Sequence, residues 1–160
     1  MIVVEKRLGE IFETLPPIVS NDVEFYPYYD FGTEKDLNIF LKERRQQDES
    51  YYPIIWLETP IDVFGEKRVN FDLKLILAER TSTPHPSNSE RVDEFFIKTL
   101  NPLFNNVIKG LRTSGFTKIT GEIKRTNYFN YLQNTDVWDA IKLESKLEMT
   151  NCNLKKIYYS

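Results

Sequence analysis

The stretch VNFDLKLIL, residues 69–77, is followed by a polar loop, TSTPHPSN at 81–88, and then by a helical segment that reaches Ser114. In residues 69–77 the odd positions are all apolar and the early even positions are polar. This period of two is typical of a strand with one face on a core and the other facing water or a partner. After the loop, apolar residues recur every three or four positions, as in an amphipathic helix: Val92, Phe95, Phe96, Leu100, Leu103, Val107 and Leu111. Strand and helix together predict a two-layer unit in which the helix covers the sheet.

Length and charge indicate a single domain with an ordinary surface. The chain has 160 residues and a formal net charge of −3. A mildly acidic chain gives no reason to expect tight binding to nucleic acid, which needs a concentrated basic surface. No apolar run approaches the ~20 residues of a membrane span, and the first residues do not form a signal peptide. The single cysteine, Cys152, excludes an internal disulfide, so we expect folding in a reducing cytoplasm.

The first third of the chain alternates helical and extended patterns. Residues 4–15 carry an apolar helical face that ends at two prolines. VEFYPYY, residues 23–29, is β-prone and aromatic, but Pro27 has no N–H for a ladder, which favours an edge strand or an extended arm. Thr33 and Asp36 can cap a short helix, so a helical insertion is expected near residues 33–50.

The remaining elements are mostly strands. YPIIWLE at 52–58 predicts a strand buried on both faces, antiparallel to the strand at 69–77. A weaker strand is expected near 119–123, followed by a polar loop at 126–136. WDAIKLESKLEM at 138–149 predicts a long strand with one wet face. The expected fold class is therefore α/β (α+β): one domain over 1–160, with a mixed, mostly antiparallel sheet and helices packed on one face in a two-layer sandwich.

No familiar catalytic motif is present. His85 is the only histidine, and the sequence offers neither a nucleophile nor an orienting group for it, so we interpret it as a plain loop residue. The glycines are scattered, which excludes a phosphate-cradling loop. We therefore expect no catalytic residues, no bound cofactor and no metal site.

One enzymatic alternative stays open. Asp62, followed ten residues later by Asp72-Leu73-Lys74, matches the pattern of metal-dependent nucleases: a lone acid, then acid-x-Lys. The two carboxylates would hold Mg²⁺ and Lys74 would assist the attacking water. However, acid-x-Lys recurs at Glu122 and at Glu144, and any strand with an alternating charged face produces it. We favour the wet-face interpretation.

The aromatic segment supplies the candidate interaction residues. Aromatic side chains at Phe25, Tyr26, Tyr28 and Tyr29 suit base stacking, but no basic residue is interleaved with them. A packed arm or a subunit interface is the preferred interpretation.

The order of these elements resembles the tail-completion or tail-terminator (head–tail joining) proteins of double-stranded DNA bacteriophages. The likeness is carried by residues 52–58, by strand 69–77 running into helix 90–113, and by Trp138 to Met149 after a tyrosine-rich loop. The helical insertion at 33–50 departs from the compact pattern of that family.

This resemblance implies a non-enzymatic structural protein of the virion. Identical subunits, roughly six or twelve, would form a closed ring in the neck or tail. The ring would contact portal, neck or tail-tube proteins, and double-stranded DNA would pass non-specifically through its lumen. Assembly would take place in the cytoplasm of the bacterial host, without a membrane. The alternatives are the nuclease-like enzyme and, third, a free cytoplasmic binding domain.

Overall fold

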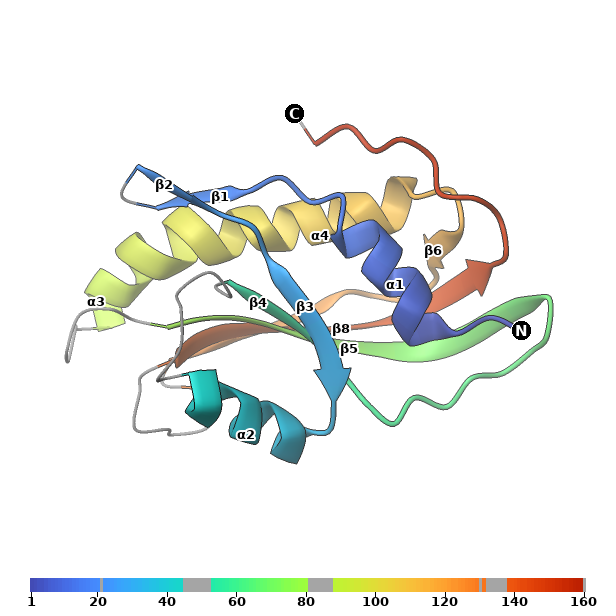
Figure 1. Cartoon of the computed structure of the whole chain (residues 1–160), viewed down its shortest axis with the longest axis horizontal. Coiled ribbons are helices and arrows are strands. Elements are labelled where there is room, and N and C mark those ends of the chain that lie inside the picture. Colours follow the sequence, from blue (N-terminus) through green and yellow to red (C-terminus); the bar gives the residue numbers. More distant parts are fainter. Residues whose placement is uncertain (21, 45–52, 81–87, 130, 132–137, 160) are drawn as a thin grey trace.

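The computed structural model describes residues 1–20, 22–44, 53–80, 88–129, 131 and 138–159 (Figure 1). Helices and strands alternate in an α+β fold, as the sequence predicts. The elements in chain order are α1 (Val4–Phe12), β1 (Ile18–Ser20), β2 (Val23–Phe25), β3 (Tyr28–Gly32), α2 (Glu34–Arg44), β4 (Ile54–Glu58), β5 (Arg68–Arg80), α3 (Asn88–Arg91), the π-helix η2 (Val92–Leu100), α4 (Asn101–Thr113), β6 (Thr117–Ile119), β7 (Lys124–Tyr128) and β8 (Trp138–Thr150).

The main sheet is mixed and mostly antiparallel, as expected. Its strand order is β3-β4-β5-β8-β6, and β7 pairs with β8 on the same side as β6. Only β3 and β4 run parallel among the paired strands described. The longest ladder joins β5 to β8, from Arg68 opposite Thr150 to Arg80 opposite Trp138. Strands β1 and β2 form a separate two-stranded hairpin.

One face of the sheet carries the principal core. The odd-numbered side chains of β5 and β8 point to this face, where α1, η2 and α4 cover them (Figure 1). The alternation read from residues 69–77 and 138–149 is thereby confirmed, and it assigns the strand faces correctly. Fully buried members of this core include Leu8, Leu73, Leu75, Leu103, Leu111, Leu143 and Leu147.

Helix α2 covers one half of the opposite face of the sheet. The sequence pattern had predicted all helices on a single face. Leu37 and Leu41 of α2 pack on Trp56 and Ile76 in a second apolar cluster. The cause lies in β4, because the side chains on both of its faces are apolar and buried. This half of the sheet therefore needs cover on both sides. The capping pair expected at the start of α2 is present: the Asp36 N–H donates to Thr33 Oγ1 at 3.1 Å, and the Thr33 N–H to Asp36 Oδ2 at 3.0 Å.

The helix after β5 changes its winding but not its course. Residues 92–100 wind as a π-helix, and an α-helix follows from Asn101, so the two segments form one continuous rod (Figure 1). Pro102 lies in the first turn of α4, at the junction of the two segments. A proline lacks the N–H of an α-helical turn, and a locally wider winding is a known way for a helix to accommodate such an interruption.

Two sequence expectations in the second half of the chain need correction. The weaker strand, β6, covers only residues 117–119. Residues 126–128, interpreted as the start of a polar loop, belong to strand β7. Most β7 side chains are exposed, so the strand has no apolar periodicity to reveal it.

The core assignment generates a first prediction. Leu75→Asp or Leu143→Asp should yield mostly insoluble protein, because each leucine is 0% exposed and its replacement would bury an unpaired charge at a cost of several kcal/mol. Lys74→Ser and Glu144→Ser, one position along the same strands, should change folding by less than ~1 kcal/mol. Soluble expression and thermal melts of the four variants test this. Equal behaviour of all four would contradict the face assignment.

Candidate functional site

The uncovered half of the second sheet face is a charged surface. We call it the charged face, and it consists of Asp72, Lys74, Lys124, Lys142, Glu144, Lys146 and Glu148. Neighbouring strands set opposite charges side by side in its rungs. Asp72 lies opposite Lys146, and Lys74 lies opposite Glu144. On the other side of β8, Lys124 of β7 lies opposite the same Glu144.

Ion pairs extend this arrangement. Lys142 Nζ lies 3.4 Å from Glu58 Oε2 and 3.9 Å from Glu144 Oε1, and Arg68 Nε lies 3.5 Å from Glu148 Oε1. Cross-strand pairs of opposite charge contribute roughly 0.2–1 kcal/mol each, so their contribution to stability is modest. Their main consequence is electrostatic, because cations and carboxylates alternate: with Glu58, Arg68 and Lys118, which share this face, six cations lie among four carboxylates.

The residues of the nuclease alternative lie on or near this face. Asp72 and Lys74 are exposed on β5, and Asp62 is exposed on the connection between β4 and β5. Asp72 and Lys74 each have a cross-strand neighbour of opposite charge. Among the described residues, no group of three His, Cys, Asp or Glu side chains is placed to hold a metal ion. Asp72 and Lys74 thus lie on the solvent-facing side of β5. The strand β8 places a residue of opposite charge beside each of them.

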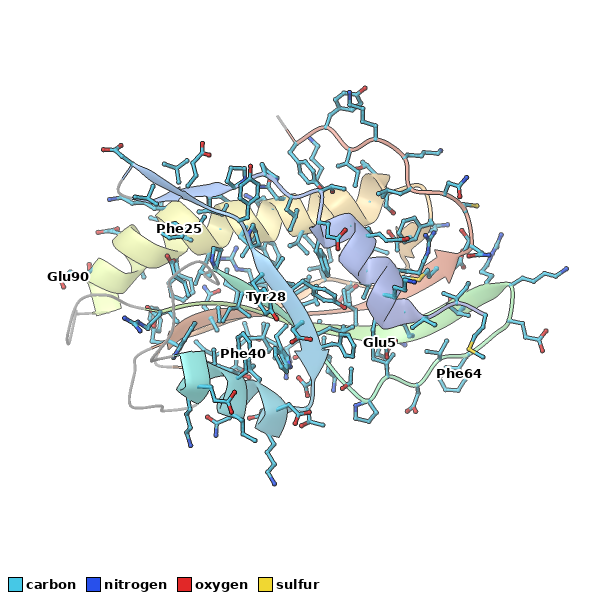
Figure 2. All side chains as sticks on the ribbon, viewed as in Figure 1. Glu5, Phe25, Tyr28, Phe40, Phe64 and Glu90 are labelled. Carbon is cyan, nitrogen blue, oxygen red and sulfur yellow. The ribbon has the colours of Figure 1, made fainter. Side chains whose placement is uncertain are left out.

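The four aromatic residues expected at an interface separate into two pairs. Tyr28 and Tyr29 belong to the edge strand β3 and pack within the chain. The Tyr28 ring stacks on Phe40 of α2, with centroids 5.5 Å apart and planes at 2° (Figure 2). Tyr29 lies on the other face, 5.0 Å from the Phe12 ring. Its hydroxyl donates to the Glu5 carbonyl at 2.7 Å, and burial, with the nearby charges of Glu5 and Asp30, raises the pKa of Tyr29.

Phe25 and Tyr26 lie on the hairpin side of the segment. Phe25 is half-buried at the end of β2, and Tyr26, which follows it, is 63% exposed. We define the hairpin as residues 18–26. Its exposed apolar side chains also include Val19 and Val23. Of the predicted interface residues, Tyr26 is therefore the one most available to a partner.

The sequence analysis missed a second exposed apolar segment. Val63 and Phe64 lie on the β4–β5 connection, and Phe64 is 69% exposed (Figure 2). Its backbone pairs with Asn70, which holds the connection against the start of β5. The two consecutive apolar residues before Gly65 were the available signal in the sequence.

A buried carboxylate pair lies at one end of the helix-covered face. Glu79 of β5 is the direct cross-strand neighbour of Asp139 of β8, and Asp139 is 0% exposed. Burial raises the pKa of Glu79 to about 8; the nearby Thr99 side chain of η2 opposes the rise, and the charge of Asp139 adds to it. At neutral pH, Glu79 is therefore mostly protonated. The sequence pattern gave no sign of it, because Glu79 reads as the polar end of a strand.

Other candidates carry no reactive arrangement. A depression of about 420 Å³ lies between the end of α4 and β6, lined by Arg112, Thr117, Lys118, Ile119, Gly121, Glu122 and Ile123. The hydroxyl of Thr117 is held within the chain, since it donates to the Leu111 carbonyl at 2.5 Å. Cys152 is an exposed free thiol, and His85 lies outside the described residues.

No protein-family model matches this chain. No curated protein matches it either. No helix in the described ranges is long and apolar enough to cross a membrane.

The geometry of Asp72 and Lys74 generates a prediction about catalysis. The purified protein should not cleave supercoiled or linear DNA with Mg²⁺ or Mn²⁺, because both side chains lie on a solvent-facing strand beside their counter-charges. Agarose-gel assays with Asp72→Asn as the comparison variant test this. Metal-dependent cleavage that disappears in D72N, with an unchanged melting curve, would establish the enzyme instead.

Glu79 generates a prediction about pH. Its native pKa of about 8 exceeds the ordinary value of 4.5, so between these values the native state holds a proton that the unfolded state has released. This group therefore makes stability fall as pH rises from 4.5 to 8. Glu79→Gln should remove that fall: E79Q should match the wild type near pH 4.5 and exceed it by ~1–3 kcal/mol at pH 8.

Urea unfolding at several pH values measures this difference. Glu66→Gln is the control, because Glu66 is exposed on the β4–β5 connection. A constant offset between E79Q and wild type at all pH values would mean that Glu79 titrates normally.

Proposed function

We propose that this chain is a structural protein of a double-stranded DNA bacteriophage virion. Copies of it form a closed ring at the head–tail junction or in the tail, and the genome passes through the lumen. The observation that carries this proposal is the division of the sheet's second face. One half is covered by α2, and the other half, which no described helix covers, is a surface of alternating charge.

The charged face suits the wall of a DNA channel. Duplex DNA carries about one negative charge per 1.7 Å of its axis, so a basic wall would hold it and an acidic wall would repel it. On the charged face each lysine lies beside a carboxylate, which keeps phosphate binding weak. The net charge of −3 for the whole chain also disfavours strong attachment to DNA. Passage of the genome would then be non-specific and easily reversible.

Exposed apolar side chains at two separate places suit contacts with neighbours. The hairpin exposes Val19, Val23 and Tyr26, and the β4–β5 connection exposes Val63 and Phe64. Exposed apolar groups that cluster on a surface often mark protein–protein contacts. Two such places would serve a subunit that contacts both its own copies and an adjacent portal, neck or tail-tube protein.

The order of the elements adds the phage context. The chain has an edge strand, the buried strand β4, the ladder β5–β8 and a long helix after β5. The resemblance to tail-completion and tail-terminator proteins rests on this order of elements. On this proposal the protein resides in the neck or tail of the virion, after assembly in the host cytoplasm. The proposal includes no cofactor and no catalytic step.

The test of the proposed function is the assembly state of the purified chain. Negative-stain electron microscopy and light scattering, at concentrations from ~1 to 100 μM, should show closed rings of roughly six or twelve copies with a central channel. Rings should not retain duplex DNA at ~150 mM salt, because the lysines of the wall lie beside carboxylates. Compact monomers throughout this range would overturn the proposal.

A further inference from the structure

The two edges of the main sheet differ in their readiness to accept another strand. On β3, the N–H of Phe31 points away from β4, and Asp30 Oδ1 accepts it at 2.8 Å. A side chain thus occupies the position that an added strand would need. Such local protection is one way in which edge strands are kept from pairing.

The opposite edge, β7, has no comparable protection in the part of the chain that the structure describes. β7 pairs with β8 along one side, from Lys124 opposite Glu144 to Tyr128 opposite Ala140, and no described strand lies on its other side. Alternate backbone N–H and C=O groups of an antiparallel strand point away from its partner. An extended segment can therefore add to β7 by backbone hydrogen bonding, which is a common mode of recognition.

The side chains of β7 define what such a segment must carry. Lys124 and Arg125 make one end of the strand basic, and both are exposed. Arg125 is positioned by Asn101, which accepts a hydrogen bond from it, and by the Phe104 ring, whose centroid lies 4.8 Å from its guanidinium carbon. At the other end, Tyr128 and Phe129 are exposed and apolar. The complementary segment would combine acidic and apolar residues.

The hairpin of this same chain has that composition. Asp22 and Glu24 are its exposed acids, and Val23 and Tyr26 are its exposed apolar residues. Its strands pair only with each other in the described structure, and β1 lies against η2 of the helix layer. Figure 1 shows the hairpin extending along the helix layer, outside the main sheet.

We infer that β2 of one copy adds to the β7 edge of the next copy in parallel, with Tyr26 opposite Tyr128 and Glu24 on the same strand face as Lys124. This inference rests on the proposed function, since it names the contact that builds the ring. The donor and acceptor are different surfaces of one subunit, so the contact is head-to-tail and propagates around a closed ring instead of forming a two-fold dimer.

An exchange of charges tests the pairing. Glu24→Lys alone should raise the concentration for half-assembly by ~10-fold or more, because the introduced ammonium group would lie beside Lys124 of the next copy. Lys124→Glu alone should do the same, because the introduced carboxylate would lie beside Glu24. An equimolar mixture of E24K and K124E should assemble again. In a ring where the two variants alternate, every contact places a lysine of one variant beside a glutamate of the other. Light scattering of both variants and of the mixture measures this.

Matched controls and a second readout separate the possible outcomes. Glu43→Lys and Lys6→Glu reverse exposed charges outside the hairpin, β7 and the β4–β5 connection, and they should assemble like the wild type. In wild-type rings, hydrogen exchange at residues 124–128 should slow by ~10-fold or more relative to dissociated subunits. If wild-type rings form while E24K and K124E assemble normally and the β7 amides stay unprotected, this contact is wrong and the ring stands. If the wild type remains monomeric, both the ring and the contact are overturned.

Discussion

The pairing of β5 with β8 is the interaction on which the rest of the structure depends. It joins Arg68–Arg80 to Trp138–Thr150 without interruption, and it brings together segments separated by the whole helix layer. Because side chains alternate across a strand, a single register fixes two surfaces at once. Leu75 opposite Leu143 lies in the core, and Lys74 opposite Glu144 lies on the charged face. A shift by one residue would bury the charges and expose the leucines, so burial of the core also specifies the surface proposed to line the channel.

Sequence patterns predicted those parts of the fold in which burial is periodic. The alternation in β5 and β8, the uninterrupted apolar run of β4 and the helical stripe through Leu103 and Leu111 each locate an element and its buried face. The capping pair at Thr33 was also readable, because it depends on residues three positions apart. In contrast, β7 has no periodic apolar residues. Its position is determined by the edge of β8, which is a tertiary constraint and leaves no local pattern.

The candidate site was predictable only where it coincides with such periodicity. The charged face follows from the even positions of two strands, and the ambiguity of Asp72 and Lys74 follows from the same alternation. The roles of the aromatic residues could not be separated, because Tyr28, Tyr29 and Tyr26 have similar neighbours in sequence. Their difference arises from distant partners: Phe40 stacks on Tyr28, and the Glu5 carbonyl accepts from Tyr29. The burial of Glu79 could not be predicted for the same reason, because it depends on η2 and Asp139, which are distant in sequence.

The two sheet edges give the proposed assembly a direction. Among the described residues, Asp30 caps one outward N–H of β3 and no such cap lies on β7, so the proposed strand addition takes place on the β7 side of each subunit. With one donor hairpin and one acceptor edge, every added copy presents the same pair of surfaces again. In a closed ring each subunit is held through two contacts, and removing it breaks both. Individually weak, partly polar contacts can then maintain a stable ring, and the free β7 edge is covered in every copy. Closure of the proposed ring would therefore have two effects. It would cover the β7 edge of every copy, and it would enclose the charged face, whose position is set by the β5–β8 register.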